Sequence, residues 1–325
     1  MEQRHLGSTG LRVSALGLGT MTWGRDTDEI DAAEQFRDFL DAGGTLVDTS
    51  ASYADGASEE VVGRQLATVR REDVVVCTKA GVRSTSRGNV LDASRGALLD
   101  SLDASLRRLG TDHVDLFLVQ SPDPHTPLEE SLTALQRAVD SGRARYVGLS
   151  NHPAWQQARA ATLLAPGTSA PTGAGLAAVE VEYSLLERGV EREVVPAALG
   201  LGTGVIAWSP LGRGVLTGKY RRTIPADSRA ASAHLAGFVQ PYLDQWASAV
   251  VDAAAIAAEG LGRSVLEVSL SWLLARPGVA SALVGARTPG QLRASLTAVD
   301  LELPAEVSAA LDEISAPALG YPERR

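Results

Sequence analysis

Eight short apolar runs recur along the chain at nearly regular intervals, and this spacing limits the possible folds more than any other feature. The runs are 15–19, 45–48, 74–79, 115–120, 146–150, 178–182, 204–208 and 282–285. The first seven end near residues 19, 48, 79, 120, 150, 181 and 208, so successive ends lie 29, 31, 41, 30, 31 and 27 residues apart. Steps of this size fit one β-strand followed by one helix. The runs are continuous rather than alternating, which is typical of parallel strands covered on both faces.

Helical patterns fill the segments between these runs. The clearest are 28–42, 92–109, 128–141, 243–259 and 265–275. Within the third, Leu128, Leu132 and Leu135 recur on one helical face. Asp28 or Thr27 is suited to capping the first helix, and Gly110 to ending the second. Strands and helices therefore alternate, which favours parallel pairing with right-handed crossovers.

Eight strand–helix units close a (β/α)₈ barrel, and we predict this α/β TIM-barrel fold as a single domain over residues 1–325. The competing architecture is an open doubly wound sheet. That fold requires a glycine-rich phosphate-binding turn, G-x-G-x-x-G, after its first strand. The sequence GLGTMT at 17–22 lacks the third glycine of this motif. We place the barrel core at 14–299, a long loop at 211–241, and a C-terminal helix and tail at 300–325.

Two further segments have recognisable patterns. Residues 4–6 and 11–13 flank the turn-forming sequence GSTG at 7–10. This arrangement predicts an N-terminal β-hairpin that caps the bottom of the barrel. Residues 165–175, with the sequence APGTSAPTGAG, predict an exposed loop.

Composition excludes several classes of protein. The 325 residues include 30 Lys and Arg against 39 Asp and Glu, a formal net charge of −9. Nucleic acids and anionic membranes attract basic surfaces, so we expect neither as a partner. The single cysteine, Cys77, excludes a disulfide framework and a cysteine-rich metal site, and we predict no metal. The chain shows no apolar run near the ~18 residues of a membrane helix and no signal-peptide core at its start, so we expect a cytoplasmic protein.

Only two of the 30 basic residues are lysines, Lys79 and Lys219. A lysine retained in such an arginine-rich chain is expected where a compact ammonium cannot be replaced by a planar guanidinium. Chance explains two residues equally well.

Ionisable side chains stand at the C-terminal ends of two neighbouring apolar runs, where a (β/α)₈ barrel carries its functional groups. Asp48 ends the second run, Lys79 ends the third, and Tyr53 follows five residues after Asp48. A structural ion pair is one explanation. In the other, the ammonium lowers the pKa of the Tyr53 phenol while Asp48 holds the ammonium in place. The phenol could then give a proton to a carbonyl oxygen as that oxygen becomes an alkoxide.

Six motifs in order resemble those of the aldo-keto reductase family. They are LGSTGLRVSALGLGTMTWG at 6–24, GGTLVDTSASYADGASEEVVG at 43–63, SLRRLGTDHVDLFLVQSPDP at 105–124, YVGLSN at 146–151, AWSPLGRGVLTGKY at 207–220 and VGARTPGQL at 284–292. The resemblance implies a (β/α)₈ barrel that binds NADPH and transfers hydride to an aldehyde or ketone. It implies catalytic roles for Asp48, Tyr53 and Lys79 that agree with the chemistry above, and it makes 211–241 a loop that covers the cofactor.

Two positions near the predicted reaction centre depart from the family pattern, as do Trp208, where tyrosine is more usual, and Ala294 and Ser295, which replace the usual Glu and Asn adenine contacts. Gln120 replaces the histidine that ends the fourth strand. Its amide can donate a hydrogen bond to a carbonyl but cannot carry charge near pH 7, and His125 is an alternative farther along the loop. Glu180 replaces a glutamine that faces the nicotinamide carboxamide, and a carboxylate cannot donate to that group unless protonated. We include Gln120 among the catalytic residues and, with Trp23 and Tyr53, in the predicted substrate pocket.

The resemblance also implies a set of cofactor-binding positions. They are Gly19, Thr20, Met21, Asp48, Ser150, Asn151, Glu180, Trp208, Ser209, Pro210, Leu211, Arg213, Gly214, Lys219, Gly285, Arg287, Gln291 and Ser295. Ser150 and Asn151 match the pair that binds the carboxamide, and Trp208 matches the aromatic residue stacked on the nicotinamide ring. Residues 209–214 match a loop that closes over the pyrophosphate. Arg287 is the predicted partner of a ribose 2′-phosphate.

Three functions remain open at this point. The first is an NADPH-dependent reductase of small-molecule carbonyl substrates. The second is an NADPH-binding regulatory or sensor protein on the same barrel, favoured by Gln120 and Glu180. The third is a cofactor-free lyase or isomerase. Asp48, Tyr53 and Lys79 favour the reductase, because a pure binding protein has no need of a tuned acid. The sequence makes no prediction of the oligomeric state.

Overall fold

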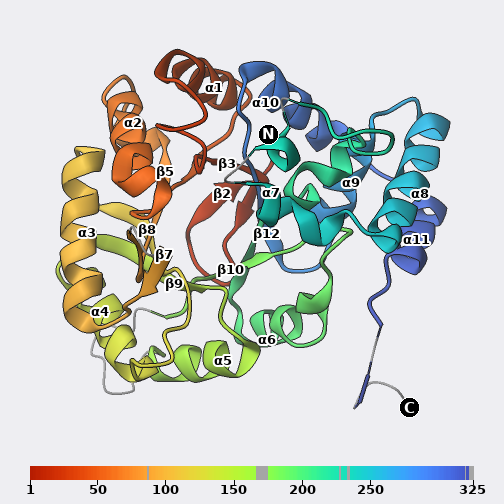
Figure 1. Ribbon diagram of the computed structural model, residues 1–325. Helices are drawn as coiled ribbons and strands as arrows, with labels where there is room; N and C mark the ends of the chain where they lie inside the picture. The colour runs from red at the N-terminus through yellow and green to blue at the C-terminus, as the bar shows by residue number, and fades with distance from the viewer. Residues whose placement is uncertain (86–87, 166–174, 227, 233–234, 319, 322–325) are drawn as a thin grey trace.

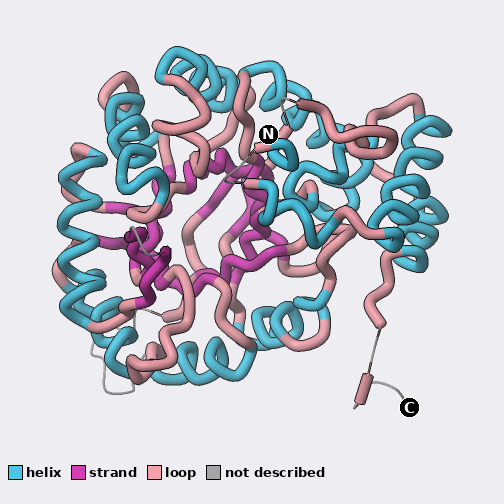
Figure 2. The backbone as a smooth tube through the Cα atoms, viewed as in Figure 1, coloured by secondary structure: helices cyan, strands magenta, loops and turns pink. Residues whose placement is uncertain are grey.

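A closed barrel of eight parallel strands lies at the centre of the computed structural model, and helices surround it (Figures 1 and 2). The structure describes residues 1–325 apart from 86–87, 166–174, 227, 233–234, 319 and 322–325. The barrel strands are β3 (Leu16–Gly19), β4 (Leu46–Asp48), β5 (Val75–Ala80), β8 (Val114–Val119), β9 (Ala144–Ser150), β10 (Ala178–Glu182), β11 (Gly204–Trp208) and β12 (Val279–Val284). Neighbours follow chain order and β12 pairs with β3, so the predicted (β/α)₈ fold is confirmed.

The helices are α1 (Glu29–Asp41), α2 (Ala57–Leu66), α3 (Arg95–Leu109), α4 (Leu128–Asp140), α5 (Ala154–Leu163), α6 (Val194–Leu201), α7 (Ala236–Val239), α8 (Gln245–Leu261), α9 (Val265–Leu274), α10 (Pro289–Leu296) and α11 (Ala305–Ile314). Of these, α1, α3, α4, α8 and α9 follow the predicted amphipathic segments, and α11 is the predicted C-terminal helix; the sequence predicted no range for the others. Asp28 caps α1 by accepting the Asp31 N–H at 2.9 Å. Gly110 ends α3 in the left-handed conformation, at φ +65°. Both local predictions are confirmed.

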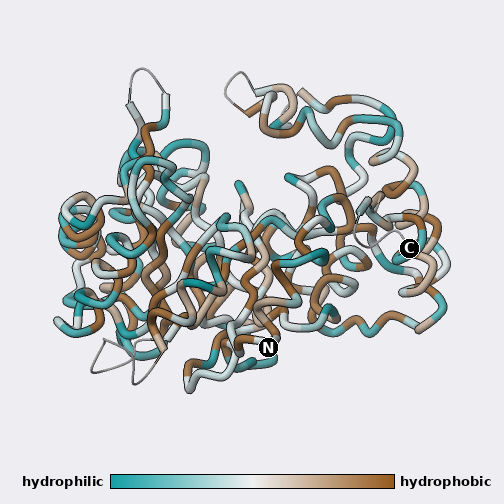
Figure 3. Tube along the Cα trace, turned by 90° about the horizontal axis from the view of Figure 1, so that it is seen from below, coloured by the Kyte–Doolittle hydropathy of each residue, from teal (hydrophilic) through white to brown (hydrophobic). Residues whose placement is uncertain are grey.

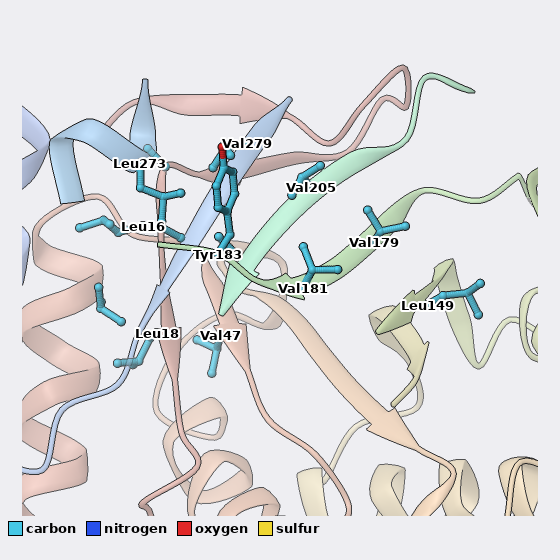
Figure 4. Close-up of a cluster of buried hydrophobic side chains, with 14 of the residues drawn as sticks. Leu16, Leu18, Val47, Leu149, Val179, Val181, Tyr183, Val205, Leu273 and Val279 are labelled. Atoms are coloured by element: carbon cyan, nitrogen blue, oxygen red, sulfur yellow. The ribbon is translucent and has the colours of Figure 1, made fainter. Parts of the chain in front are cut away.

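Two apolar layers hold the barrel together. The outer layer lies between strands and helices, and Figure 4 shows Leu16, Val205 and Val279 within it. The inner layer fills the barrel itself and includes Leu46 and Leu116. Strands buried on both faces explain why the sequence runs are continuously apolar.

The N-terminal hairpin closes one end of the barrel, as predicted. It pairs β1 (Gln3–His5) with β2 (Arg12–Ser14) in antiparallel register. Leu6 and Val13 are fully buried and join the inner apolar layer. Figure 3 shows the N-terminus, which leads into this hairpin, at one end of the barrel. An apolar plug therefore seals the end opposite the C-terminal ends of the strands.

A second hairpin was not predicted. It pairs β6 (Val82–Thr85) with β7 (Gly88–Leu91) directly after β5. The β7 side chains are exposed, so its sequence lacks the alternation of apolar and polar residues that predicts a strand. No helix in the described part of the chain is long and apolar enough to cross a membrane.

The structure differs from the prediction in the last barrel strand and in the segment 211–241. The last barrel strand begins at Val279 rather than at residue 282, because 279–281 are also buried. The segment 211–241, called the covering segment below, is not the open loop expected. It contains short helical turns and α7, and its Val215, Leu216 and Val239 side chains are buried. Most of the loop predicted at 165–175 lies outside the described residues.

Candidate active site

A cavity of about 260 Å³ opens at the C-terminal ends of the barrel strands. The predicted residues that line it are Gly19, Met21, Asp48, Tyr53, Lys79, Gln120, Ser150, Asn151, Glu180, Trp208, Ser209, Pro210, Leu211, Arg213, Gly214 and Gly285. The remaining lining residues are Thr22, Arg229, Phe238, Leu283 and Val284. Parallel strands thus bring residues far apart in sequence to one rim.

Lys79 lies at the floor of this cavity and is 1% exposed. Its Nζ donates to Asp48 Oδ1 at 2.7 Å and Oδ2 at 2.5 Å, and to the Thr49 carbonyl at 3.0 Å. Burial works against the charged ammonium, but Asp48 and then Glu180 outweigh it and raise the pKa of Lys79 well above its usual value. The ammonium is therefore held charged and fixed in direction.

Glu180, on β10, is the second carboxyl at the floor. Its Oε1 lies 3.3 Å from Lys79 Nζ, whereas its buried Oε2 has no hydrogen-bond partner among the described residues. Burial, and then the charge of Asp48, raises the pKa of Glu180 to about 8. Asp48, Cys77 and Glu180 offer ligand-type atoms within 4.8 Å of one another. Because the Lys79 ammonium already contacts both carboxyls, the protein's own cation occupies this cluster.

Tyr53 stands beside the ammonium, with Lys79 Nζ 5.2 Å from the centre of its ring. It begins a short turn, Tyr53–Gly56, in which Ala54 and Asp55 adopt left-handed φ values of 48° and 54°. The predicted lowering of the Tyr53 pKa is wrong as a net effect. Burial is the largest influence, and with Asp48 and Glu180 it raises the pKa despite the Lys79 charge, which lowers it. The sequence could not show that two carboxyls share one ammonium.

Gln120 follows directly after β8 and faces the same cavity. Its Oε1 accepts from the Ser50 hydroxyl at 2.7 Å and from the Ser52 hydroxyl at 3.0 Å. The two hydroxyls fix the amide, so its Nε2 is the group left to donate into the cavity. His125, the alternative, does not line the cavity and lies in an exposed loop, where its backbone N–H donates to Asp123.

Asn151 connects three walls of the cavity. Its Nδ2 donates to the Gln120 carbonyl at 2.9 Å, and its Oδ1 accepts from the Trp208 indole at 3.0 Å. Asn151 has a φ of 61°, and Ser209 and Arg213 on the same rim have φ values of 50° and 57°. Left-handed non-glycine residues are uncommon and gather at functional sites.

Arg213, predicted to contact a pyrophosphate, lines the cavity and is also held by contacts within the protein. Its guanidinium forms a bidentate pair with Glu182, at 2.8 and 2.5 Å, and donates to the Phe238 carbonyl at 2.6 Å. It also lies 4.1 Å from the centre of the Phe238 ring. These contacts hold the covering segment against β10.

A cluster of cations lies beside the cavity, formed by Lys219, Arg229 and Arg287 and called the basic cluster below. Burial lowers the pKa of Lys219, and the charges of Arg229 and Arg287 lower it further. Burial and the charge of Arg287 likewise lower the pKa of Arg229. Arg229, which lines the cavity, was missed by sequence analysis because its segment has no regular pattern. Because the chain contains many arginines, residue type alone did not distinguish Arg229 from the others.

Several predicted residues lie outside the cavity. Trp23 is fully buried in the outer apolar layer, with its indole N–H 3.4 Å from Gln35 Oε1, so its placement in the substrate pocket is wrong. Thr20 is buried, and its hydroxyl bonds to the Asp48 carbonyl at 3.0 Å. Ser295 is buried and bonds back to the Gln291 carbonyl at 3.1 Å. Gln291 and Arg287 line a separate groove, where Gln291 Oε1 accepts the Arg287 backbone N–H.

Comparison with known proteins identifies relatives of this chain. A model of the Aldo/keto reductase family matches residues 15–316. An uncharacterized oxidoreductase of Bacillus subtilis (strain 168), YrpG, is 36% identical over 97% of this chain and 96% of its own length. The aldo-keto reductase YhdN of the same organism is 33% identical, covering 90% of this chain and 87% of its own length.

A further relative carries a different kind of name. A probable voltage-gated potassium channel subunit beta of Oryza sativa subsp. japonica is 33% identical over 100% of this chain and 98% of its own length. Matches of this extent, on a barrel whose polar groups gather at one rim, show that the chain belongs to the aldo/keto reductase family of oxidoreductases.

Proposed function

We propose that the protein is an NADP(H)-dependent carbonyl reductase that acts on aldehydes or ketones. The observation that carries this proposal is the fully buried Lys79, bonded to both oxygens of Asp48 beside the Tyr53 ring. A buried ammonium with a paired carboxylate and an adjacent phenol suits proton transfer to a developing alkoxide.

The residues around the cavity fit a dinucleotide. Glu180 Oε2 is a buried polar atom without a partner, as expected of a group that bonds a ligand. The basic cluster suits phosphates, because like charges brought together favour an anion between them. Glycines stand next to these cations: a Cβ on Gly214 would lie 3.4 Å from Lys219 Nζ, and one on Gly285 would lie 3.9 Å from Arg229 Nη2. Without side chains, both positions leave backbone accessible beside the cations, which suits contact with a phosphate.

Each catalytic side chain has a distinct role in the proposed reaction. When bound, the reduced nicotinamide supplies the hydride to the carbonyl carbon. Gln120 Nε2 donates a hydrogen bond to the carbonyl oxygen and orients it. Tyr53 gives its proton to the same oxygen as negative charge develops there, and Lys79 stabilises the phenolate that remains. The basic cluster selects the 2′-phosphate of NADPH over NADH.

Cofactor binding and turnover test this proposal together. A thermal melt with NADPH and NADH side by side should show a larger rise in melting temperature with NADPH, because a ligand of the folded state stabilises it. Steady-state oxidation of NADPH with a panel of aldehydes, ketones and keto-sugars should reveal at least one substrate. A melt that neither cofactor changes would favour the cofactor-free lyase or isomerase instead.

A regulatory NADPH-binding protein is the second candidate function. The relative named as a potassium channel subunit beta favours it, as do Gln120 and Glu180, which depart from the family pattern. This candidate predicts tight NADPH binding without oxidation by any carbonyl in the panel.

A further inference from the structure

Glu180 is a buried acid that the reaction described above does not use. It lies on β10, is 2% exposed and is one of the residues that line the cavity. Its Oε1 lies 3.3 Å from Lys79 Nζ, and its Oε2 is buried without a hydrogen-bond partner among the described residues. A buried carboxylate oxygen without a hydrogen bond costs free energy, which protonation would relieve.

Among the described residues, titratable groups face Glu180 from two neighbouring strands and one turn. Asp48 faces it from β4, Lys79 and Cys77 from β5, and Tyr53 from the turn after β4. Its register partners on β9 and β11, Ser150 and Ile206, do not titrate. Two carboxyls thus share a single ammonium. Asp48 takes both short contacts, at 2.7 and 2.5 Å, against 3.3 Å for Glu180.

This unequal sharing decides where a proton belongs. Asp48 is the better-paired carboxylate, so Glu180 is the carboxyl that remains protonated when nothing else compensates its charge. A protonated Glu180 can donate from Oε2 to a carbonyl oxygen, as the amide of a glutamine would. An added positive charge at the cavity wall would instead favour the carboxylate.

We propose that Glu180 is a proton-linked selector between the two forms of the cofactor: it keeps its proton beside the neutral reduced nicotinamide and releases it to solvent beside the cationic oxidised ring. The inference rests on the proposed function, since it requires a nicotinamide at the wall that Glu180 forms. It makes the preference for reduced over oxidised cofactor dependent on pH.

The direction of this dependence follows from the pKa. With a pKa of about 8 in the free protein, Glu180 is protonated at pH 7. Binding of NADP⁺ lowers that pKa and expels the proton, so the affinity for NADP⁺ rises with pH, by up to about tenfold per unit, until the free group has ionised. Binding of NADPH raises that pKa instead, because protonated Glu180 donates a hydrogen bond to the ligand. Affinity for NADPH therefore stays level while the free group is protonated and weakens at higher pH.

Calorimetry of cofactor binding tests the selector. NADP⁺ and NADPH are titrated into wild-type protein and into Glu180→Gln at pH 7, in buffers of different ionisation enthalpy, which gives the number of protons released. We expect wild-type protein to release nearly one more proton with NADP⁺ than with NADPH. Glu180→Gln should abolish this difference, because its neutral amide cannot ionise. Both forms carry the same 2′-phosphate, so its own ionisation cancels in the comparison.

The outcomes separate this inference from the proposed function. Binding of both forms with no difference in proton release, or with the same difference in Glu180→Gln, would overturn the selector and leave the reductase standing. Failure of both forms to bind would overturn both. If Glu180→Gln does not fold, infrared difference spectra of wild-type protein give the answer: the band of a protonated carboxyl must disappear when NADP⁺ replaces NADPH.

Discussion

The floor of the cavity and the basic cluster are built on opposite principles. At the floor, Asp48 and Glu180 surround one ammonium, and all three groups are carried by barrel strands and are almost fully buried. In the basic cluster, Lys219, Arg229 and Arg287 lie on connecting segments. Burial first, and then the like charges of their neighbours, lower the pKa values of Lys219 and Arg229.

The two regions have different roles in the proposed reaction. Ionisable groups that are fixed on strands and paired with opposite charges have their positions and pKa values set before any ligand binds. A group of like charges gains free energy chiefly when an anion arrives. We therefore expect substitutions at the floor to change the chemical step and substitutions in the basic cluster to change cofactor affinity.

The largest effect is expected from replacing the lysine at the floor. Lys79→Met removes the cation that stabilises the Tyr53 phenolate, so hydride transfer at saturating NADPH should slow by about 10³–10⁴-fold. Lys219→Met, at the only other lysine, is the matched control and should weaken NADPH binding while leaving that step near the wild-type rate. Stopped-flow single turnovers separate the two. Equal slowing in both variants would remove the distinction between the regions.

Gln120 should come next in size. Gln120→Ala removes a donor to the carbonyl oxygen and should lower turnover by about 10²–10³-fold, with little change in NADPH affinity. Gln120→His should keep or raise activity on simple aldehydes, and its pH–rate profile should gain an ionisation near ~6.5. Wild-type behaviour of Gln120→Ala on every active substrate would make the residue structural and strengthen the regulatory candidate.

The sealed end of the barrel provides a contrast to the cavity. Val13 is fully buried in the hairpin plug, and Val13→Ala should lower the free energy of unfolding by about 2 kcal/mol through lost apolar burial and the small cavity left. Chemical denaturation measures this change. Cofactor affinity and turnover should stay at wild-type values; a fall in either under native conditions would show that the two ends of the barrel are coupled.

The smallest effect is expected in the basic cluster. Arg229→Ala should raise the NADPH dissociation constant about tenfold, equivalent to about 1.4 kcal/mol, and change hydride transfer little. Arg221→Ala is the control, because Arg221 pairs with Asp252 at the surface. Arg287→Ala should weaken NADPH about tenfold and leave NADH nearly unchanged, since only NADPH carries the 2′-phosphate. Equal losses for both cofactors would exclude that role for Arg287.

The sequence predicts which residues the order of the strands brings together, but it does not predict side-chain positions that depend on packing. Asp48 and Lys79 could be paired in advance, because neighbouring parallel strands must end at one rim. Trp23 could not be placed, since a tryptophan after a strand faces either the cavity or the helices, and only the packing of α1 decides. The pair between Arg213 and Glu182 could not be predicted either, since nothing in the sequence indicates that the two side chains meet. Arg229 lies in a segment whose short turns carry no periodic signal.

In the proposed reaction, Tyr53 gives the proton to a carbonyl substrate. Tyr53→Phe keeps the ring and removes only the hydroxyl, and Tyr146→Phe makes the same change inside the barrel beside the hairpin plug. Single-turnover hydride transfer, in a step shown to be limited by chemistry, should slow by about 10²–10⁴-fold in Tyr53→Phe, with NADPH affinity retained and Tyr146→Phe unaffected. Wild-type transfer rates in Tyr53→Phe would show that another group gives the proton.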